Sequence, residues 1–192
     1  SVAQIGYIGL GISLANPLGF VGAVLHVLNH AIMKGGLFLV AGNLRVRIGH
    51  STIPQFDDSL RRAMPWTMAA FAVFALSMVG IPPLAGFFSK WYLVLGGLER
   101  ENGIAVGVIL LSSLLNAVYF FRVLERVYLR PLFPAVVQLH TSNPHPSVWA
   151  EKEAKPSMLV PTLIMAVALV VLGLLNALIV NELIVCMLPS GL

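Results

Sequence analysis

The sequence predicts an all-α polytopic membrane protein with about five transmembrane helices, one of them broken in its middle. Of its 192 residues, 58% are hydrophobic and 10% are charged, whereas soluble domains carry about 25% charged residues. The mean hydropathy is +0.88. The charges also segregate into loops, and of twelve Lys and Arg only Lys34 and Lys90 lie deep inside apolar runs. We therefore interpret residues 1–192 as a single transmembrane domain.

The first apolar run predicts a helix over residues 1–14. It is shorter than the roughly 20 residues that cross a bilayer, and the chain begins without Met. We therefore expect both the helix and the domain to be truncated at the N-terminus. Pro17 ends this helix, because the residue before a proline disfavours the helical conformation.

The second apolar run predicts a complete span over residues 18–44. Gly42 and Asn43 provide a C-terminal stop signal for it. A polar loop follows over residues 45–65, and Pro65 suits the first turn of the next helix.

The third run, residues 66–98, is long enough to cross a bilayer but carries four residues that oppose a continuous helix. Proline lacks an amide donor and glycine is flexible, and this set comprises Gly80, Pro82, Pro83 and Gly86. Lys90 follows closely. Broken backbone is tolerated at membrane depth only where protein covers it or where it lines a watery cavity. The sequence therefore predicts a broken helix over Gly80–Gly86, with a charge beside the break.

The remaining runs predict helices over residues 104–128 and 158–188. A tight turn at residues 99–103 precedes the first of them. The loop at 129–156 separates the two, and residues 133–140 within it favour a short amphipathic helix.

The loops predict the orientation in the membrane. Nine cations belong to one side and only Arg100 to the other, which predicts that loops 45–65 and 129–156 are cytoplasmic and the C-terminus is outside. The nine are Arg45, Arg47, Arg61, Arg62, Arg122, Arg126, Arg130, Lys152 and Lys155.

Polar residues inside the spans form one regular series. His26, His30 and Lys34 are spaced i, i+4, i+8, so they share a helix face over roughly 12 Å. Imidazole both accepts and donates a proton, and intramembrane ionisable groups favour a functional role. Together with Lys90, the series predicts a proton relay bridged by single waters.

Two other interpretations of the series stay open. The histidines are also compatible with structural hydrogen bonds to carbonyls of neighbouring helices. A metal site, as in a membrane-embedded metalloenzyme, would need a third ligand, and the spans at 1–14, 18–44 and 66–98 contain no Asp, Glu or Cys for it, so we predict no metal. Weaker polar candidates, which helix–helix hydrogen bonding explains equally well, are Gln4, Tyr7, Ser112, Ser113, Asn116 and Tyr119.

Other classes of function lack a signal in the sequence. There is no phosphate loop, nucleotide fingerprint, catalytic triad or haem motif, so we predict no catalytic residue and no cofactor in this chain. No basic patch alternates with aromatic residues, which argues against nucleic acid as a partner. The lone Cys186 has no partner for an internal disulfide.

Four segments resemble a known family. They are His-Val-Leu-Asn-His-Ala-Ile-Met-Lys-Gly-Gly-Leu-Phe-Leu-Val-Ala-Gly at 26–42, Gly-Ile-Pro-Pro-Leu-Ala-Gly-Phe-Phe-Ser-Lys at 80–90, Ser-Val-Ala-Gln-Ile-Gly-Tyr at 1–7, and Leu-Leu-Asn-Ala-Val-Tyr-Phe-Phe-Arg at 114–122. The chain resembles the proton-conducting antiporter-like membrane subunits. These include the pumping subunits of respiratory complex I, the large subunits of multisubunit sodium/proton antiporters, and membrane-bound hydrogenases.

The resemblance implies the second half of a fold with two inverted repeats. It implies that Lys90 is the terminal lysine of an exit half-channel, Lys34 and His30 the central relay, and His26 a further hydrated member. A lysine at position 90 makes the chain similar to the D-type component of the multisubunit sodium/proton antiporters and to some complex I subunits.

The implied function is proton translocation, alone or in exchange for sodium, together with other membrane subunits in a bacterial inner membrane. The parent complex would be a complex I-like NADH:quinone oxidoreductase or a monovalent cation/proton antiporter. A non-conducting structural subunit of the same kind of complex is the alternative.

Overall fold

The computed structural model describes residues 2–48, 58–129 and 153–184, and these form a bundle of helices. The predicted all-α class is thereby confirmed. The elements are α1 (Val2–Ser13), α2 (Pro17–Ile48), α3 (Asp58–Ala63), α4 (Pro65–Val79), α5 (Ala85–Glu99), α6 (Gly103–Leu124), the wide turn η2 (Glu125–Leu129), α8 (Pro156–Leu174), α9 (Asn176–Leu178) and the wide turn η4 (Ile179–Ile184).

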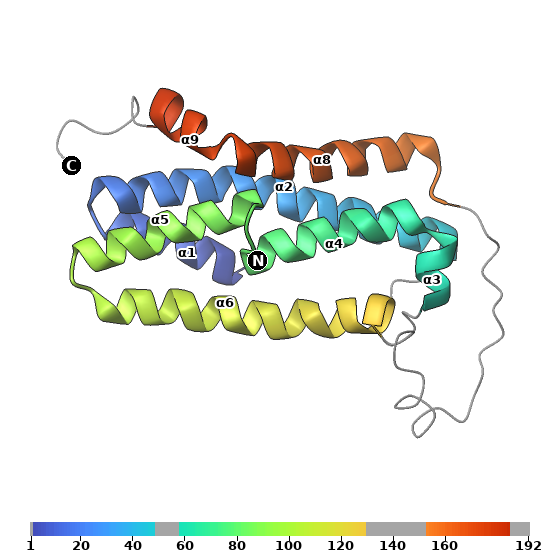
Figure 1. The fold of residues 1–192 in the computed structure, drawn as a ribbon, viewed down its shortest axis with the longest axis horizontal. Helices are drawn as coiled ribbons and strands as arrows, with labels where there is room; N and C mark the ends of the chain where they lie inside the picture. The colour runs from blue at the N-terminus through green and yellow to red at the C-terminus, as the bar shows by residue number, and fades with distance from the viewer. Residues whose placement is uncertain (1, 49–57, 130–152, 185–192) are drawn as a thin grey trace, which may run out of the picture.

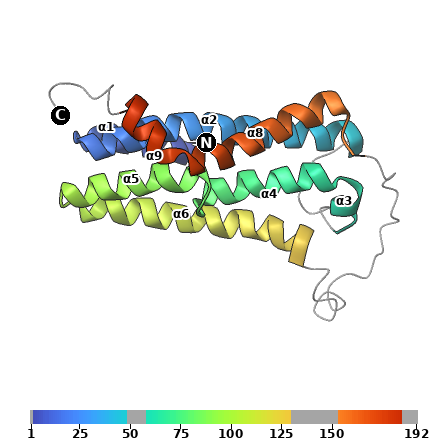
Figure 2. The same ribbon diagram turned by 45° about the horizontal axis from the view of Figure 1, so that its top comes forward.

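The long helices lie side by side in successive layers (Figure 1). Helices α2 and α8 form one side, α4 and α5 follow each other end to end through the middle, and α6 runs along the other side. The turned view shows the same order (Figure 2). Helix α2 makes its most extensive contacts with α5, while α1 packs against the same two helices. The bundle is therefore organised around α2 and the α4–α5 pair.

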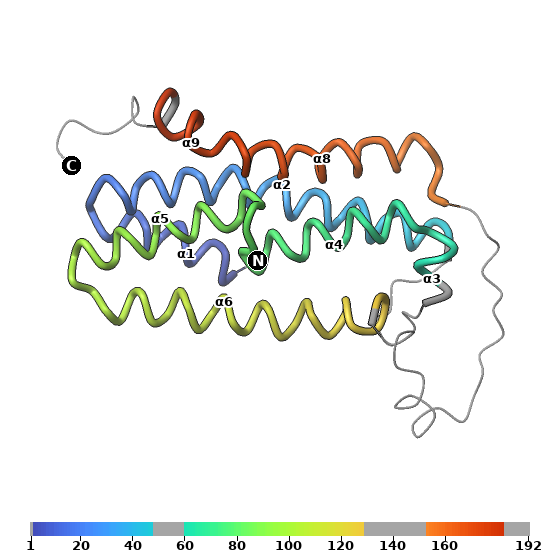
Figure 3. Tube along the Cα trace, viewed as in Figure 1, coloured from blue at the N-terminus to red at the C-terminus, as the bar shows by residue number. Residues whose placement is uncertain are grey.

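Three helices in the described part of the chain are long and apolar enough to cross a membrane alone: α2, α6 and α8. Helices α4 and α5 have 15 residues each, less than one bilayer thickness. The tube trace shows them joined end to end across the length of the bundle (Figure 3). The membrane span predicted at residues 66–98 is therefore formed by α4 and α5 together. The chain belongs to an integral membrane protein.

The predicted stop at Gly42 and Asn43 is wrong. Helix α2 continues to Ile48, with Arg45 and Arg47 in its last turn, where cations interact favourably with the helix dipole. Asn43 does not end the helix because its buried side chain donates a hydrogen bond to Thr162 Oγ1, at 3.1 Å. The predicted loop at 45–65 also contains the short helix α3.

The last predicted helix is shorter than expected. Helix α8 ends at Leu174, and α9 and η4 follow as separate short elements up to Ile184. Helices α1 and α6 agree more closely with their predicted ranges. The N-terminus of α6 is capped by Asn102 Oδ1, which accepts from the amide of Ala105 at 3.0 Å. Residues 133–140 and Cys186 lie outside the described residues.

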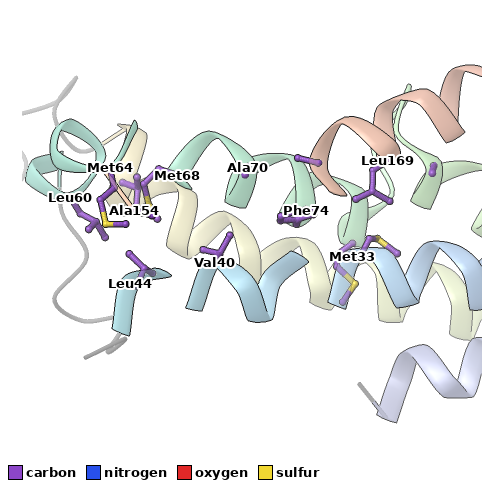
Figure 4. Close-up of a cluster of buried hydrophobic side chains, with 14 residues drawn as sticks. Met33, Val40, Leu44, Leu60, Met64, Met68, Ala70, Phe74, Ala154 and Leu169 are labelled. Atoms are coloured by element: carbon purple, nitrogen blue, oxygen red, sulfur yellow. The ribbon is translucent and has the colours of Figure 1, made fainter. Parts of the chain in front are cut away.

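An apolar core fills the space between the C-terminal half of α2, α4 and α8 (Figure 4). Phe74 and Leu169 are fully buried there, and Met33 nearly so. Gly36 of α2 faces the Phe74 ring so closely that a Cβ at this position would lie 2.2 Å from it. The absence of a side chain at Gly36 therefore lets α2 and α4 approach.

The break between α4 and α5 spans Gly80 to Leu84. Gly80 ends α4 with a φ of 94°, a left-handed conformation that glycine adopts readily. Pro82 and Pro83 lie in the connection. Gly86, predicted to lie in the break, instead belongs to the first turn of α5.

Neighbouring helices cover the break closely. A Cβ at Gly86 would lie 1.9 Å from the Ser77 carbonyl oxygen, and one at Gly173 of α8 would lie 2.1 Å from that of Pro83. Asn29 of α2 donates to the Ala85 carbonyl at 2.8 Å. The irregular backbone is therefore shielded by protein, as its position within a span requires.

Candidate functional site

Lys90 lies in α5 with 7% of its surface exposed, and its ammonium reaches back to the end of α4. The Nζ atom donates to the carbonyls of Met78 at 2.8 Å and Val79 at 3.0 Å. In an unbroken helix these carbonyls would accept from the amides four residues later. Those residues are Pro82 and Pro83, which have no amide hydrogen. The lysine therefore binds the two carbonyls that the prolines leave without a helical donor.

His26 is fully buried and both of its ring nitrogens contact polar side chains. Its Nδ1 lies 3.0 Å from Ser89 Oγ, and its Nε2 lies 3.0 Å from Gln4 Oε1. Ser89 belongs to α5 and Gln4 to α1, so the imidazole joins three helices. Hydrogen bonding at both nitrogens fixes the orientation of the ring.

Tyr7 of α1 contacts both the histidine series and the lysine. Its ring lies edge-on to that of His26, with centroids 5.2 Å apart. The Lys90 ammonium is 5.4 Å from the Tyr7 ring centroid, within cation–π range. The Tyr7 hydroxyl lies 3.4 Å from Ser113 Oγ of α6. His26 and Lys90 therefore face the same aromatic ring.

The other two members of the series lie further along α2. The His30 ring is stacked on that of His26, with centroids 6.2 Å apart and planes only 1° from parallel. The Nδ1 atom of His30 is buried and has no hydrogen-bond partner among the described residues. Lys34 is partly buried, and its ammonium lies 5.7 Å from the Phe38 ring centroid.

The described side chains do not come together as a set of metal ligands. No group of three or more His, Cys, Asp or Glu side chains comes together within residues 2–48, 58–129 and 153–184. Moreover, both His26 nitrogens are already engaged by Gln4 and Ser89. The metalloenzyme interpretation therefore has no support from the arrangement of these side chains.

Sequence reasoning missed Ser89, Ser77 and Asn29. Ser77 Oγ accepts from the amide of Gly86 at 3.2 Å, while Asn29 and Ser89 tie α2 to α5. A single serine in an apolar run carries no signal of its own, because its partner depends on which helices cross there. Asn29 was detectable, since it lies one turn from His26 on a neighbouring part of the helix surface.

The weaker polar candidates divide into two groups. Gln4, Tyr7 and Ser113 contact the site or a residue of it. Asn116 has its amide nitrogen buried without a partner among the described residues. Tyr119 is 57% exposed, and no contact joins Ser112 to the site in the described part of the chain.

Comparison with protein families identifies a family that this chain matches. Residues 1–116 match the sequence model of the family described as NADH:quinone oxidoreductase/Mrp antiporter, transmembrane. These residues include α1, α2, the broken helix and the first part of α6.

Two relatives illustrate the range of similar proteins. NADH-quinone oxidoreductase subunit N of Desulforudis audaxviator is 46% identical over 200 residues, covering 98% of this chain and 38% of the relative. The D-type component of the Na(+)/H(+) antiporter of Alkalihalophilus pseudofirmus is 37% identical over 115 residues, covering 60% of this chain and 23% of the relative. The chain thus spans well under half the length of these relatives.

Solved structures share the fold. The Mrp complex from a Dietzia species aligns with a TM-score of 0.77 at 26% identity, over 93% of this chain and 39% of that chain. Respiratory complex I from Thermus thermophilus aligns with a TM-score of 0.76 at 22% identity, over 94% of this chain and 35% of that chain. The second match is evidence for the fold alone.

Proposed function

Because the chain belongs to the NADH:quinone oxidoreductase/Mrp antiporter transmembrane family, we propose that it is part of a proton-translocating membrane subunit. Its parent is a complex I-like NADH:quinone oxidoreductase or a multisubunit monovalent cation/proton antiporter. It works there with other membrane subunits, in the bacterial inner membrane. We expect any electron transfer to take place in those other subunits and not in this chain.

One observation carries the proposal: the buried Lys90 lies at the break of the helix and beside the polar series of α2. Its ammonium binds the Met78 and Val79 carbonyls, and it shares the Tyr7 ring with His26. A buried ammonium is costly unless it is paired or solvated. The carbonyls lower this cost without neutralising the charge, which keeps the group able to release and regain a proton.

In the proposed path, protons move along α2 through Lys34, His30 and His26 and then cross to Lys90 on α5. The stacking of His26 on His30 limits how they exchange protons. The two rings are parallel with centroids 6.2 Å apart, and no direct hydrogen bond joins them among the described residues. A bridging water is therefore required between them, and the unpartnered His30 Nδ1 provides an acceptor or donor for it.

The orientation that we propose follows from the cations. The loops 45–65 and 129–156 face the cytoplasm, and the C-terminus lies outside. Lys90 comes after the break in a helix that starts on the cytoplasmic side, so it belongs to the outer half. That position suits proton exit, with Lys34 and the histidines delivering to it. If the parent complex is an antiporter, we propose that sodium is the ion exchanged for protons.

The test is Lys90→Ala in the full-length protein within its parent complex. Proton translocation would be measured in inverted membrane vesicles with a pH-sensitive dye, at matched protein content. We expect coupled translocation to be lost or sharply reduced, because the path loses its relay group on α5. The matched control is Lys155→Ala, which removes an exposed lysine outside the spans.

Normal translocation by an assembled Lys90→Ala complex would reject the proposed function. That outcome would favour the alternative of a non-conducting structural subunit.

A further inference from the structure

We propose that the hydroxyl of Ser89 carries the proton across from α2 to α5, as the link between His26 and Lys90. This inference rests on the proposed function and assigns a role to a residue that the sequence did not single out. Ser89 precedes Lys90 in α5 and is fully buried. Its Oγ lies 3.0 Å from His26 Nδ1, a distance at which the two atoms are directly hydrogen-bonded.

Of the two side chains that contact the ring nitrogens of His26, only Ser89 is suited to pass a proton on. Gln4 Oε1 lies at Nε2, and a carboxamide accepts a hydrogen bond without readily taking up a proton. A charged His26 donates from both nitrogens, and Gln4 and Ser89 both offer an oxygen to receive these bonds. Gln4 therefore acts as a positioning residue that holds the imidazole with Nδ1 directed at the serine.

Ser89 also has an onward contact. Its hydroxyl donates to the Gly86 carbonyl at 3.2 Å. Gly86 is three residues before Ser89 and four before Lys90, so its carbonyl lies on the part of the α5 surface that both side chains share. The hydroxyl therefore has one neighbour on the α2 side and another in the direction of the lysine.

Gly80 brings the backbone of the break close to these groups. A Cβ built at Gly80 would lie 3.2 Å from Lys90 Cδ, 3.6 Å from Lys90 Nζ and 3.8 Å from the Gly86 carbonyl oxygen. The lysine and the carbonyl that Ser89 contacts therefore lie beside the same glycine. In the proposed transfer, a single water that hydrogen-bonds to both the Ser89 hydroxyl and the Lys90 amine completes the connection.

The transfer conserves protons at each group along the way. The Ser89 hydroxyl first turns its hydrogen from the Gly86 carbonyl to the water. The N–H bond at His26 Nδ1 then breaks as its proton binds Ser89 Oγ, and the hydroxyl's original proton passes to the water. The water in turn gives one of its protons to the neutral amine of Lys90, forming the ammonium. Serine and water each end with the number of protons they started with, and the net change is one proton from imidazolium to lysine.

The experiment compares Ser89→Ala with Ser89→Thr in the full-length protein within its parent complex. Thr keeps the hydroxyl, whereas Ala removes it. We expect Ser89→Ala to slow proton translocation about tenfold or more at equal protein content, since it removes one hydrogen-bonded step. Ser89→Thr should retain most of the rate. The control is Thr162→Val, which deletes another fully buried hydroxyl, remote from the site.

Each outcome either supports or overturns the role of the hydroxyl. Wild-type translocation in Ser89→Ala would overturn the inference, and so would equal losses in Ser89→Ala and Ser89→Thr, because the hydroxyl would then not be what matters. If Ser89→Ala fails to assemble, Ser89→Val replaces it, since valine has nearly the shape of threonine but no hydroxyl, and equal rates in Ser89→Val and Ser89→Thr would overturn the inference. Impaired Lys90→Ala with normal Ser89→Ala would reject this inference alone, whereas normal Lys90→Ala would reject the proposed function itself.

Discussion

The two halves of α2 have different surroundings although both run through the same bundle. The N-terminal half meets α1 and α5 through hydrogen bonds, with His26 bonded to Gln4 and Ser89. The C-terminal half meets α4 and α8 mainly through apolar contacts, as Val40 and Phe74 illustrate (Figure 4). The neighbour changes from α5 to α4 at the helix break. The break therefore marks the boundary between a polar half and a closely packed apolar half.

This boundary explains why a discontinuous helix is useful here. A continuous helix would satisfy its own carbonyls and offer α2 a uniform apolar surface. Breaking it frees the Met78 and Val79 carbonyls for Lys90 and places Lys90 in the half of the bundle where His26 bonds to Gln4 and Ser89. The apolar half then supplies the packing that holds the break in place.

The largest expected effect comes from removing the close contact at the boundary itself. In Gly86→Ala the new Cβ would lie 1.9 Å from the Ser77 carbonyl oxygen. Both groups are held by backbone, so α4 and α5 would have to separate. We expect no correctly assembled protein, measured as the amount of this chain in the purified complex.

Gly6→Ala is the matched control, because nothing lies within 4 Å of a Cβ at Gly6. Normal assembly of Gly86→Ala would show that the two half-helices tolerate separation, and the boundary between the polar and apolar halves would lose its structural basis.

The second effect concerns Lys34, one turn beyond His30 on α2. In Lys34→Met the side chain stays long and flexible but loses its titratable group. We expect assembly to be preserved and proton translocation to fall about tenfold or more, because the proposed path would lose one of its titratable groups. Vesicle translocation assays at matched protein content measure this, with Lys155→Met as the control. Failure to assemble would instead assign Lys34 a structural role.

The smallest effect is expected in the apolar half. Phe74→Leu changes the shape of a fully buried side chain and should lower the stability by about 1 kcal/mol. Translocation per assembled complex should stay at the wild-type rate, since the residue lies away from the polar contacts. Thermal unfolding of the purified complex and the vesicle assay test the two statements separately. A loss of translocation larger than the loss of assembled protein would contradict the division into two halves.

The sequence predicted most of the fold and part of the site. Hydropathy located the spans, and Pro82 and Pro83 located the break, because both signals are local. The end of α2 was predicted wrongly because Asn43 finds its partner on α8, a contact that no local pattern reveals. The series of His26, His30 and Lys34 was visible from its spacing. Ser89 was not, since its importance arises only where α5 crosses α2.

Pro82 and Pro83 leave two carbonyls for Lys90 to bind, and the number of N–H bonds on its side chain decides whether it can hold both. An ammonium has three N–H bonds, and two of them go to Met78 and Val79, so one remains to be given away. The neutral amine keeps two N–H bonds and gains a lone pair. Lys90 therefore has enough donors to hold both carbonyls in either charge state, and the backbone at the break need not rearrange when the lysine changes from ammonium to neutral amine.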